Sequence, residues 1–167
     1  MKSHTLSVLV ENRAGVLSRV AGMFSRRGFN IESLAVGTCE EPDMSRITIV
    51  VNGDGSVVEQ VMKQTNKLID VIKVSDLTER ESVERELALI KVAAEPGTSR
   101  AEILQIADIF RAQVVDVGAK TLVLQVAGDT EKIDALEKLL RQYGIKELVR
   151  TGKIAILRGA KTVKSSK

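Results

Sequence analysis

The sequence predicts an α+β chain made of two similar halves, each with the element order βαββαβ. Apolar segments of strand length alternate with amphipathic helical patterns, and the same order of elements occurs twice along the chain. Phe24 and Phe110, which close the first helix of each half, indicate a repeat period of about 85 residues. A chain of 167 residues is long enough for two small domains.

The first half contains four segments of strand character and two helical patterns. The strands are expected over 6–10, 29–37, 46–52 and 70–77, with a polar loop over 39–45. The first helix is expected over 16–27, where Gly28 ends it. The second helix is expected to begin at a capping box formed by Ser56 and Glu59 and to run to Leu68.

The second half repeats this order. Its strands are expected over 88–93, 113–117, 121–127 and 145–149, with a further short strand over 154–157. One helix is expected to begin at a second capping box, Ser99 to Glu102. The other follows Asp129 and ends at Gly144.

The order βαββαβ is that of the ferredoxin-like fold, an antiparallel four-stranded sheet with both helices on one face. The other face and the sheet edges are then available to a partner, so we expect a homodimer. The expected segments are an N-terminal domain over 4–78, a charged linker over 79–86, a C-terminal domain over 87–158 and a solvated basic tail over 159–167.

Composition indicates a soluble, cytoplasmic protein that binds neither nucleic acid nor membranes. The net charge of +3 is accounted for by three lysines in the last nine residues, so the folded part is neutral. The central strands carry no aromatic side chains on which RNA bases would stack. No apolar run is long enough to cross a bilayer, the N-terminus does not resemble a signal peptide, and the single Cys39 indicates a reducing compartment.

No catalytic or metal-binding motif is present in the sequence. His4 is the only histidine and is expected to precede the first strand, and no zinc or phosphate-loop pattern occurs. Arg13 and Asn30 resemble the arginine and asparagine of acylphosphatases, but the rest of that phosphate loop is missing. We therefore expect a protein without enzymatic activity or a cofactor of its own.

The segment that joins the first strand to the first helix is the strongest candidate binding site. A helix N-terminus presents free N–H groups and a partial positive charge, which together hold carboxylates. Gly15, with the small Ala14 beside it, permits close approach of a ligand; alternatively, Asn12 and Gly15 form only a tight turn.

Asn30 is polar at the start of the second strand, where an apolar residue is expected. Its amide can hold an ammonium or a carboxylate group, or it can satisfy the last carbonyls of the preceding helix. Because Asn12 and Asn30 lie at opposite ends of that helix, they can contact one ligand only across a two-fold axis. A shared site therefore predicts a dimer.

Six segments resemble the small, regulatory subunit of acetohydroxyacid synthase, also called acetolactate synthase. The resemblance covers residues 4–159 in order. The segments are SVLVENRAGVLSRVAGMFSRRGFNIESLAVG, SRITIVV, KLIDVIKV, RELALIKV, IFRAQVVDVG and RTGKIAILRG.

This resemblance implies an N-terminal ACT domain followed by a ferredoxin-like domain peculiar to these subunits. It implies a non-catalytic subunit that binds and activates a large catalytic subunit and confers feedback inhibition by valine, leucine or isoleucine. The thiamine diphosphate, FAD and Mg²⁺ of the enzyme would be carried by that partner. The alternative is a stand-alone amino-acid-sensing ACT protein, although the sequence has no helix-turn-helix segment.

The resemblance also places the effector between two ACT domains. The matching positions here are Asn12, Arg13, Ala14, Gly15, Val16, Leu17, Asn30 and Ile31. Backbone N–H groups near Gly15 would receive the effector carboxylate, and Val16, Leu17 and Ile31 would form an aliphatic wall. Ala35 and Gly37 depart from the common pattern nearby, which affects the choice of effector rather than the existence of the site.

Overall fold

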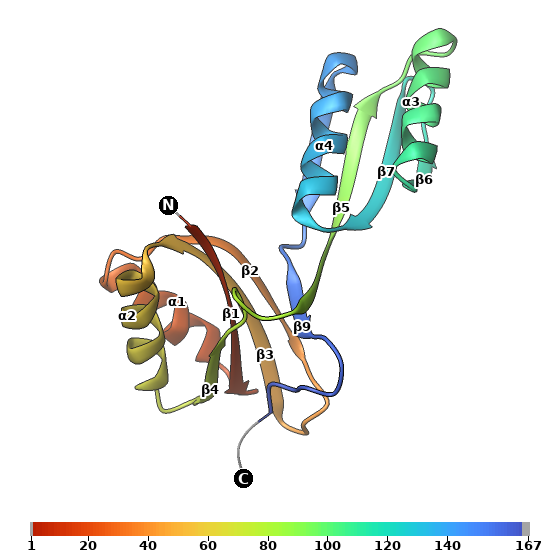
Figure 1. Ribbon diagram of the computed structural model, residues 1–167. Coiled ribbons are helices and arrows are strands. Elements are labelled where there is room, and N and C mark those ends of the chain that lie inside the picture. Colours follow the sequence, from red (N-terminus) through yellow and green to blue (C-terminus); the bar gives the residue numbers. More distant parts are fainter. Residues whose placement is uncertain (1, 165–167) are drawn as a thin grey trace. The chain divides into compact units, whose positions relative to one another are not determined.

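A computed structural model describes residues 2–164 of the chain, which divide into two compact units. The first unit comprises Met1–Val83 together with Ile154–Lys167, and the second comprises Glu84–Lys153. The chain therefore leaves the first unit after residue 83 and returns to it at residue 154 (Figure 1). Each unit is described separately below.

The first unit is the expected antiparallel sheet with two helices. Its elements are β1 (Lys2–Glu11), α1 (Val16–Arg26), β2 (Ile31–Thr38), β3 (Met44–Gly53), α2 (Gly55–Asn66) and β4 (Val71–Asp76). The strand order is β2-β3-β1-β4, and the register places Leu6 opposite Ile49 and Val8 opposite Ile47. These alternate residues form the core with the apolar faces of α1 and α2. The ferredoxin-like arrangement is confirmed.

β1 begins four residues earlier than the apolar pattern suggests, which changes the position of His4. The strand starts at Lys2 and pairs with β3 from there, with His4 opposite Val51. His4 is only 8% exposed, so it is a buried strand residue and not part of a mobile N-terminus.

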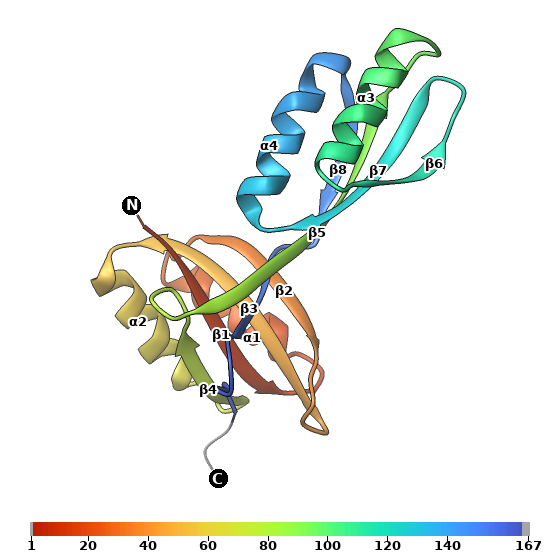
Figure 2. The same cartoon turned by 45° about the vertical axis from the view of Figure 1, so that its right-hand side comes forward.

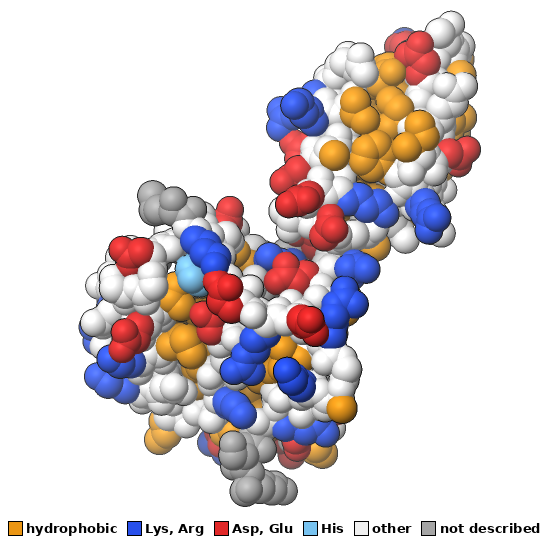
Figure 3. Space-filling view, viewed as in Figure 1, with side chains coloured by type: hydrophobic (Ala, Val, Ile, Leu, Met, Phe, Trp, Pro, Cys, Tyr) orange, Lys and Arg blue, Asp and Glu red, His pale blue; other side chains and the backbone are white. Residues whose placement is uncertain are grey.

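The second unit repeats the architecture. Its elements are β5 (Ser82–Ala93), α3 (Thr98–Ile109), β6 (Gln113–Val117), β7 (Thr121–Gly128), α4 (Thr130–Leu140), a 3-10 turn (Arg141–Tyr143) and β8 (Ile145–Arg150). The strand order is β6-β7-β5-β8, and Ile90, Leu124 and Leu136 are among its fully buried side chains. Exposed apolar side chains also occur on α3 and α4, and hydrophobic side chains gather on that face of the unit (Figure 3).

Both predicted capping boxes are wrong. α2 is capped two residues earlier by Asp54, whose Oδ1 accepts hydrogen bonds from the backbone N–H groups of Ser56 (2.9 Å) and Val57 (3.1 Å). α3 begins after Gly97 without a side-chain cap, and the Ser99 hydroxyl instead donates to the Glu95 carbonyl at 3.3 Å. Asp54 and Ser56 lie close together at the start of α2, and Thr98 and Ser99 at the start of α3, so spacing alone did not identify the capping residue.

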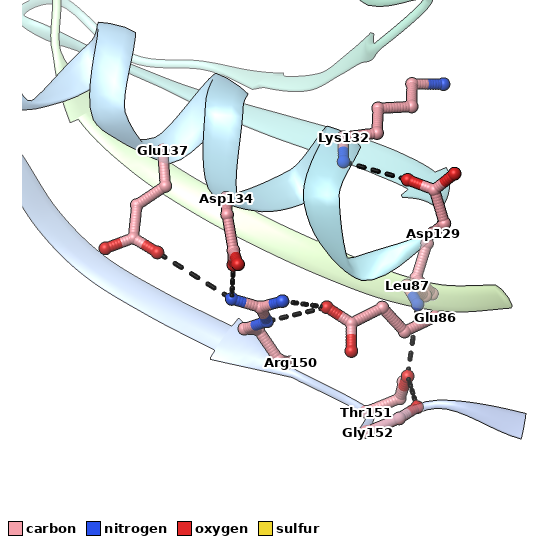
Figure 4. Close-up of polar contacts among 9 residues, drawn as sticks. All are labelled: Glu86, Leu87, Asp129, Lys132, Asp134, Glu137, Arg150, Thr151 and Gly152. Atoms are coloured by element: carbon pink, nitrogen blue, oxygen red, sulfur yellow. Dashed lines mark hydrogen bonds and ion pairs between the residues drawn. The ribbon is translucent and has the colours of Figure 1, made fainter. Parts of the chain in front are cut away.

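The charged segment 79–86 is not a separate linker, because β5 already begins at Ser82. Glu86 is 7% exposed, and it accepts a hydrogen bond from Nε of Arg150 at 2.7 Å, with a second contact from Nη2. Nη1 of Arg150 donates to Asp134 at 2.6 Å and lies 3.8 Å from Glu137 (Figure 4). Burial lowers the pKa of Arg150, but the hydrogen bonds to Asp134 and Glu86 outweigh burial and raise it.

The C-terminal boundary also differs from the expected end of the second domain at residue 158. β9 (Ile154–Leu157) forms as predicted, but it pairs with β5 and belongs to the first unit. The backbone N–H of Arg158 donates to the Glu81 carbonyl at 2.9 Å, which continues this pairing. The second unit is therefore inserted between two parts of the first.

The sheet of the first unit is covered on both faces. Thr5, Ser7 and Leu9 point away from the helices, yet each is buried. The C-terminal segment lies beside the sheet in both views (Figures 1 and 2), and its Leu157 and Val163 pack with Leu77. The chain itself therefore occupies the face that the sequence left open for a partner.

In the part of the tail that the structure describes, residues 159–162 and Lys164 are exposed as predicted, but Val163 is buried and the segment is held to the first unit. Nη1 of Arg46 donates to the Val163 carbonyl at 2.9 Å, and Nζ of Lys73 donates to the Lys164 carbonyl at 3.0 Å. Val163 is buried against the first unit. Residues 165–167 lie outside the described residues.

Candidate functional site

The loop between β1 and α1 is a tight turn held by backbone hydrogen bonds. The N–H of Asn12 donates to the Asp43 carbonyl at 2.8 Å, and the N–H of Arg13 donates to the Glu11 carbonyl at 3.0 Å. Gly15 is the residue before the helix and has φ +83°, a left-handed conformation that glycine adopts without strain. The turn interpretation is therefore confirmed, and it is compatible with a binding site.

The N-terminus of α1 is uncapped. Among the residues that the structure describes, no side chain accepts a hydrogen bond from its first turn, and that turn contains no acidic residue. The N–H of Arg19 donates to the Gly15 carbonyl at 3.0 Å, so the N–H groups of Leu17 and Ser18 have no acceptor within the helix. An anion placed here meets two free donors and the positive end of the helix dipole.

Arg19 adds a full positive charge beside this turn, and sequence reasoning did not find it. A Cβ atom added to Gly15 would lie 3.0 Å from Nη1 of Arg19, which places the guanidinium next to Gly15. Nε of Arg19 donates to Oδ2 of Asp70 at 2.6 Å, and Asp70 is 6% exposed. The sequence did contain a signal for this contact, because residues four positions apart on a helix, such as Gly15 and Arg19, lie on the same face.

The predicted site residues of the loop differ in how far their side chains are exposed to solvent. Asn12, Arg13, Ala14 and Gly15 are all exposed, and Arg13 forms an ion pair with Glu11 at 3.1 Å. Val16 is buried in the core of the first unit, so its side chain does not form part of an exposed aliphatic wall. Leu17 remains 43% exposed, so its side chain is available to a ligand on the loop side.

Asn30 and Ile31 lie at the far end of α1. The last carbonyls of the helix accept hydrogen bonds from the backbone N–H groups of Arg27, Gly28 and Phe29, so within the described part of the chain Asn30 is not needed as their partner. Asn30 is exposed and Ile31 is half-buried. A helix of 11 residues spans about 16 Å, so one chain does not bring Asn30 to the loop.

Comparison with known proteins identifies the family of this chain. A family model described as an AHAS small subunit-like ACT domain matches residues 6–73, and one described as the small subunit of acetolactate synthase matches residues 85–159. A probable acetolactate synthase small subunit from Archaeoglobus fulgidus is 61% identical over 158 residues, which span 95% of this chain and 98% of the relative. This chain belongs to the acetolactate synthase small-subunit family.

Other members of the small-subunit family agree with this assignment. The acetolactate synthase small subunit of Mycolicibacterium smegmatis is 51% identical over 165 residues, covering 99% of this chain and 96% of the relative. The crystal structure of the small subunit from Thermotoga maritima is 40% identical, with a TM-score of 0.87 over 96% of this chain and 100% of that chain. The first unit is thus an ACT domain, and the chain has the regulatory role of its family.

The β2 edge of this ACT domain is flanked by exposed apolar side chains. β2 is an edge strand, and hydrogen bonds join it to β3 on one side. Arg19 of α1 pairs with Asp70, just before β4, so Leu17 and Ala21 lie on the opposite flank of the helix, toward β2. Val36 of β2 is 47% exposed. Apolar side chains therefore flank the free edge.

Within residues 2–164, no helix is long and apolar enough to cross a membrane. In the same part of the chain, no group of three or more His, Cys, Asp and Glu side chains is placed to hold a metal ion. Cys39 is a half-buried thiol in the turn between β2 and β3.

Proposed function

We propose that this chain binds the large catalytic subunit of an acetolactate synthase, activates it, and makes it sensitive to inhibition by valine or another branched-chain amino acid. The observation that carries the proposal is the uncapped N-terminus of α1, with Arg19 beside Gly15, in a domain of the ACT family. Thiamine diphosphate, FAD and Mg²⁺ would belong to the catalytic partner.

The effector site is completed by a second copy of the chain. If the β2 edges of two copies pair antiparallel, the start of one strand lies beside the end of the other. α1 runs antiparallel to β2, so its N-terminal loop lies near the end of that strand. The pairing therefore brings the Asn12–Gly15 loop of one copy close to Asn30 of its mate, as the predicted dimer requires.

Each part of an amino-acid effector then has a suitable partner. The carboxylate is received by the N–H groups of Leu17 and Ser18 and by the charge of Arg19. The amide oxygen of the mate's Asn30 accepts from the ammonium group. Leu17 and the mate's Ile31 contact the aliphatic side chain, which discriminates between chains differing by one methylene by only about 1–3 kcal/mol. Partial response to leucine and isoleucine is expected.

Inhibition further requires that the effector bind one state of the assembled enzyme more tightly than another, because equal affinity shifts no equilibrium. The decisive experiment mixes this chain with its cognate large subunit and measures acetolactate formation with and without valine. We expect added chain to raise the rate and valine to lower it again. A stand-alone sensor would bind valine and leave the catalytic subunit unaffected.

Light scattering on the purified chain tests the dimer separately. We expect the mass of two copies, and replacing Val36 by glutamate at the β2 edge is expected to shift the chain toward one copy. A single-copy mass for the unmodified chain at working concentration, combined with no response of the melting temperature to valine, leucine or isoleucine, would exclude the proposed site.

A further inference from the structure

The first unit contains a cavity that is separate from the N-terminus of α1. It has a volume of about 760 Å³ and lies where β1 begins, α1 ends and α2 begins. Its polar lining includes Lys2, His4, Arg27, Asn30 and Asn52. This volume is within the range of small-molecule sites, and none of the residues from Asn12 to Leu17 lines it.

The charges around this cavity favour an anionic ligand. Arg27 forms no ion pair or side-chain hydrogen bond with any described residue, whereas Lys2 is paired with Glu79. Asp54 also lines the cavity, but its Oδ1 is engaged by the first N–H groups of α2. The free guanidinium of Arg27 is therefore the group available to a carboxylate, with amide donors on Asn30 and Asn52.

The cavity floor is apolar. Phe29, Val51 and Val57 line it, and Val51 is part of the buried core. A ligand with a short hydrocarbon chain would cover these side chains, and each buried methylene contributes about 0.8 kcal/mol. Polar groups at the rim and apolar groups at the floor are the usual composition of a small-molecule site.

His4 forms part of the wall between this cavity and a neighbouring one. It is 8% exposed and lines both this cavity and a neighbouring one of about 390 Å³ along α2. Its Nδ1 is buried and has no hydrogen-bond partner among the described residues, since the nearest carboxylate oxygen, Oδ2 of Asp76, is 3.8 Å away. Asp76 lines the neighbouring cavity and not the larger one, so His4 contributes to the larger cavity as a wall residue whose signals report on an occupant.

We propose that this cavity binds a small aliphatic monocarboxylate, with the carboxylate at Arg27 and the hydrocarbon chain on Phe29, Val51 and Val57. The site is complete within one chain, unlike the effector site proposed above. The two sites share only Asn30. A ligand without an amino group fits because the one carboxylate in the lining, Asp54, already accepts hydrogen bonds from the backbone of Ser56 and Val57 and from the Ser56 hydroxyl through its Oδ1.

The test uses His4 as a reporter, because it is the only histidine in the chain. Isovalerate is titrated into the full-length protein while the imidazole C–H signals of His4 are followed by NMR. We expect a saturable shift with isovalerate and none with isoamyl alcohol, which has the same hydrocarbon chain without the carboxylate. No saturable shift with isovalerate, or equal shifts with both compounds, would overturn the proposal.

The neighbouring arginines provide a matched pair of variants. Arg27→Gln removes the charge at the cavity and is expected to weaken isovalerate binding roughly tenfold, the effect of one charge-assisted hydrogen bond. Arg26→Gln removes an adjacent exposed charge that does not line the cavity and should leave binding unchanged. Equal losses in both variants would indicate a general effect of charge and refute the assignment.

The experiments distinguish an error in this proposal from an error in the proposed effector site. A Gly15→Asp variant that loses valine binding but keeps the isovalerate response of His4 supports two sites. If valine alone shifts the His4 signals and isovalerate does not compete, the cavity assignment is wrong while the effector proposal stands.

Discussion

Replacing Gly15 by alanine or by aspartate separates backbone strain from ligand binding at the N-terminus of α1. Gly15 has φ +83°, a conformation that costs an alanine about 1–2 kcal/mol. The added Cβ meets only the far end of the Arg19 side chain, at 3.0 Å, which can move aside. Gly15→Ala should therefore lower the free energy of unfolding by about 1–2 kcal/mol while leaving the N–H groups of Leu17 and Ser18 free.

Aspartate at the same position should have the opposite pattern. Its carboxylate can cap α1, which contributes about 1 kcal/mol and offsets the strain, and aspartate tolerates the left-handed conformation better than alanine. The same carboxylate occupies the donors that the effector needs and repels the effector's own charge. Loss of two charge-assisted hydrogen bonds, at about 1.5 kcal/mol or more each, predicts that valine binds at least a hundredfold more weakly.

Urea unfolding measures the stability of each variant, and calorimetry measures valine binding. The expected outcome is crossed: the alanine variant is less stable but binds valine within about tenfold of the unmodified chain, and the aspartate variant is nearly as stable but does not bind. If alanine abolishes binding as completely as aspartate does, then the backbone conformation and not the free donors governs the site. If aspartate leaves binding intact, the carboxylate is held elsewhere.

Three further predictions concern stability. Glu86→Gln should lower the free energy of unfolding by about 2 kcal/mol, because it weakens charge-assisted hydrogen bonds to a partly buried Arg150. Asp134→Asn, at the exposed side of the same arginine, should lower it by less than about 1 kcal/mol, as measured by urea unfolding. Val163→Asp should release the C-terminal segment and cost about 2 kcal/mol, whereas Lys161→Asp on the exposed side should not, and equal losses would contradict the packing described. Hydrogen bonds from Ser56 and Val57 lower the pKa of Asp54 below its ordinary value. The ionised Asp54 therefore stabilises the fold fully at a pH above its ordinary pKa, and this stabilisation is lost as the pH falls through the lowered pKa. The difference in melting temperature between Asp54→Ala and the unmodified chain should accordingly disappear in strong acid.

The fold was predictable from sequence because local patterns agreed with the global arrangement. The period-two alternation of β1 and β3 and the apolar face of α1 follow directly from the residues that form the core. The cap of α2 was misplaced because Asp54 and Ser56 both favour that position, and only the backbone conformation distinguishes them.

Long-range contacts explain the other errors. The segment 79–86 is highly charged, yet Glu86 is buried because Arg150, 64 residues later, pairs with it. The tail is basic, yet Val163 packs against Leu77. Neither pairing leaves a signal within a sequence window, so composition indicated exposure in both cases.

The candidate site was predictable in part for the same reason. Gly15 marks the turn through its own backbone requirement, and Asn30 interrupts an apolar strand, so both are visible locally. The helical spacing places Arg19 near Gly15, but the ion pair that holds its guanidinium is formed with Asp70, which lies 51 residues later just before β4. The inward direction of Val16 likewise depends on how α1 packs on the sheet.

The return of the chain at Ile154 has a consequence for synthesis on the ribosome. The C-terminal segment covers the face of the ACT sheet that the helices leave open. It contacts residues far earlier in the chain; Lys73 and Lys164, for example, are separated by 91 positions. Contacts of such long sequence separation form slowly. The first half of the nascent chain must therefore wait, with one side of its sheet bare, until the intervening module has emerged and folded.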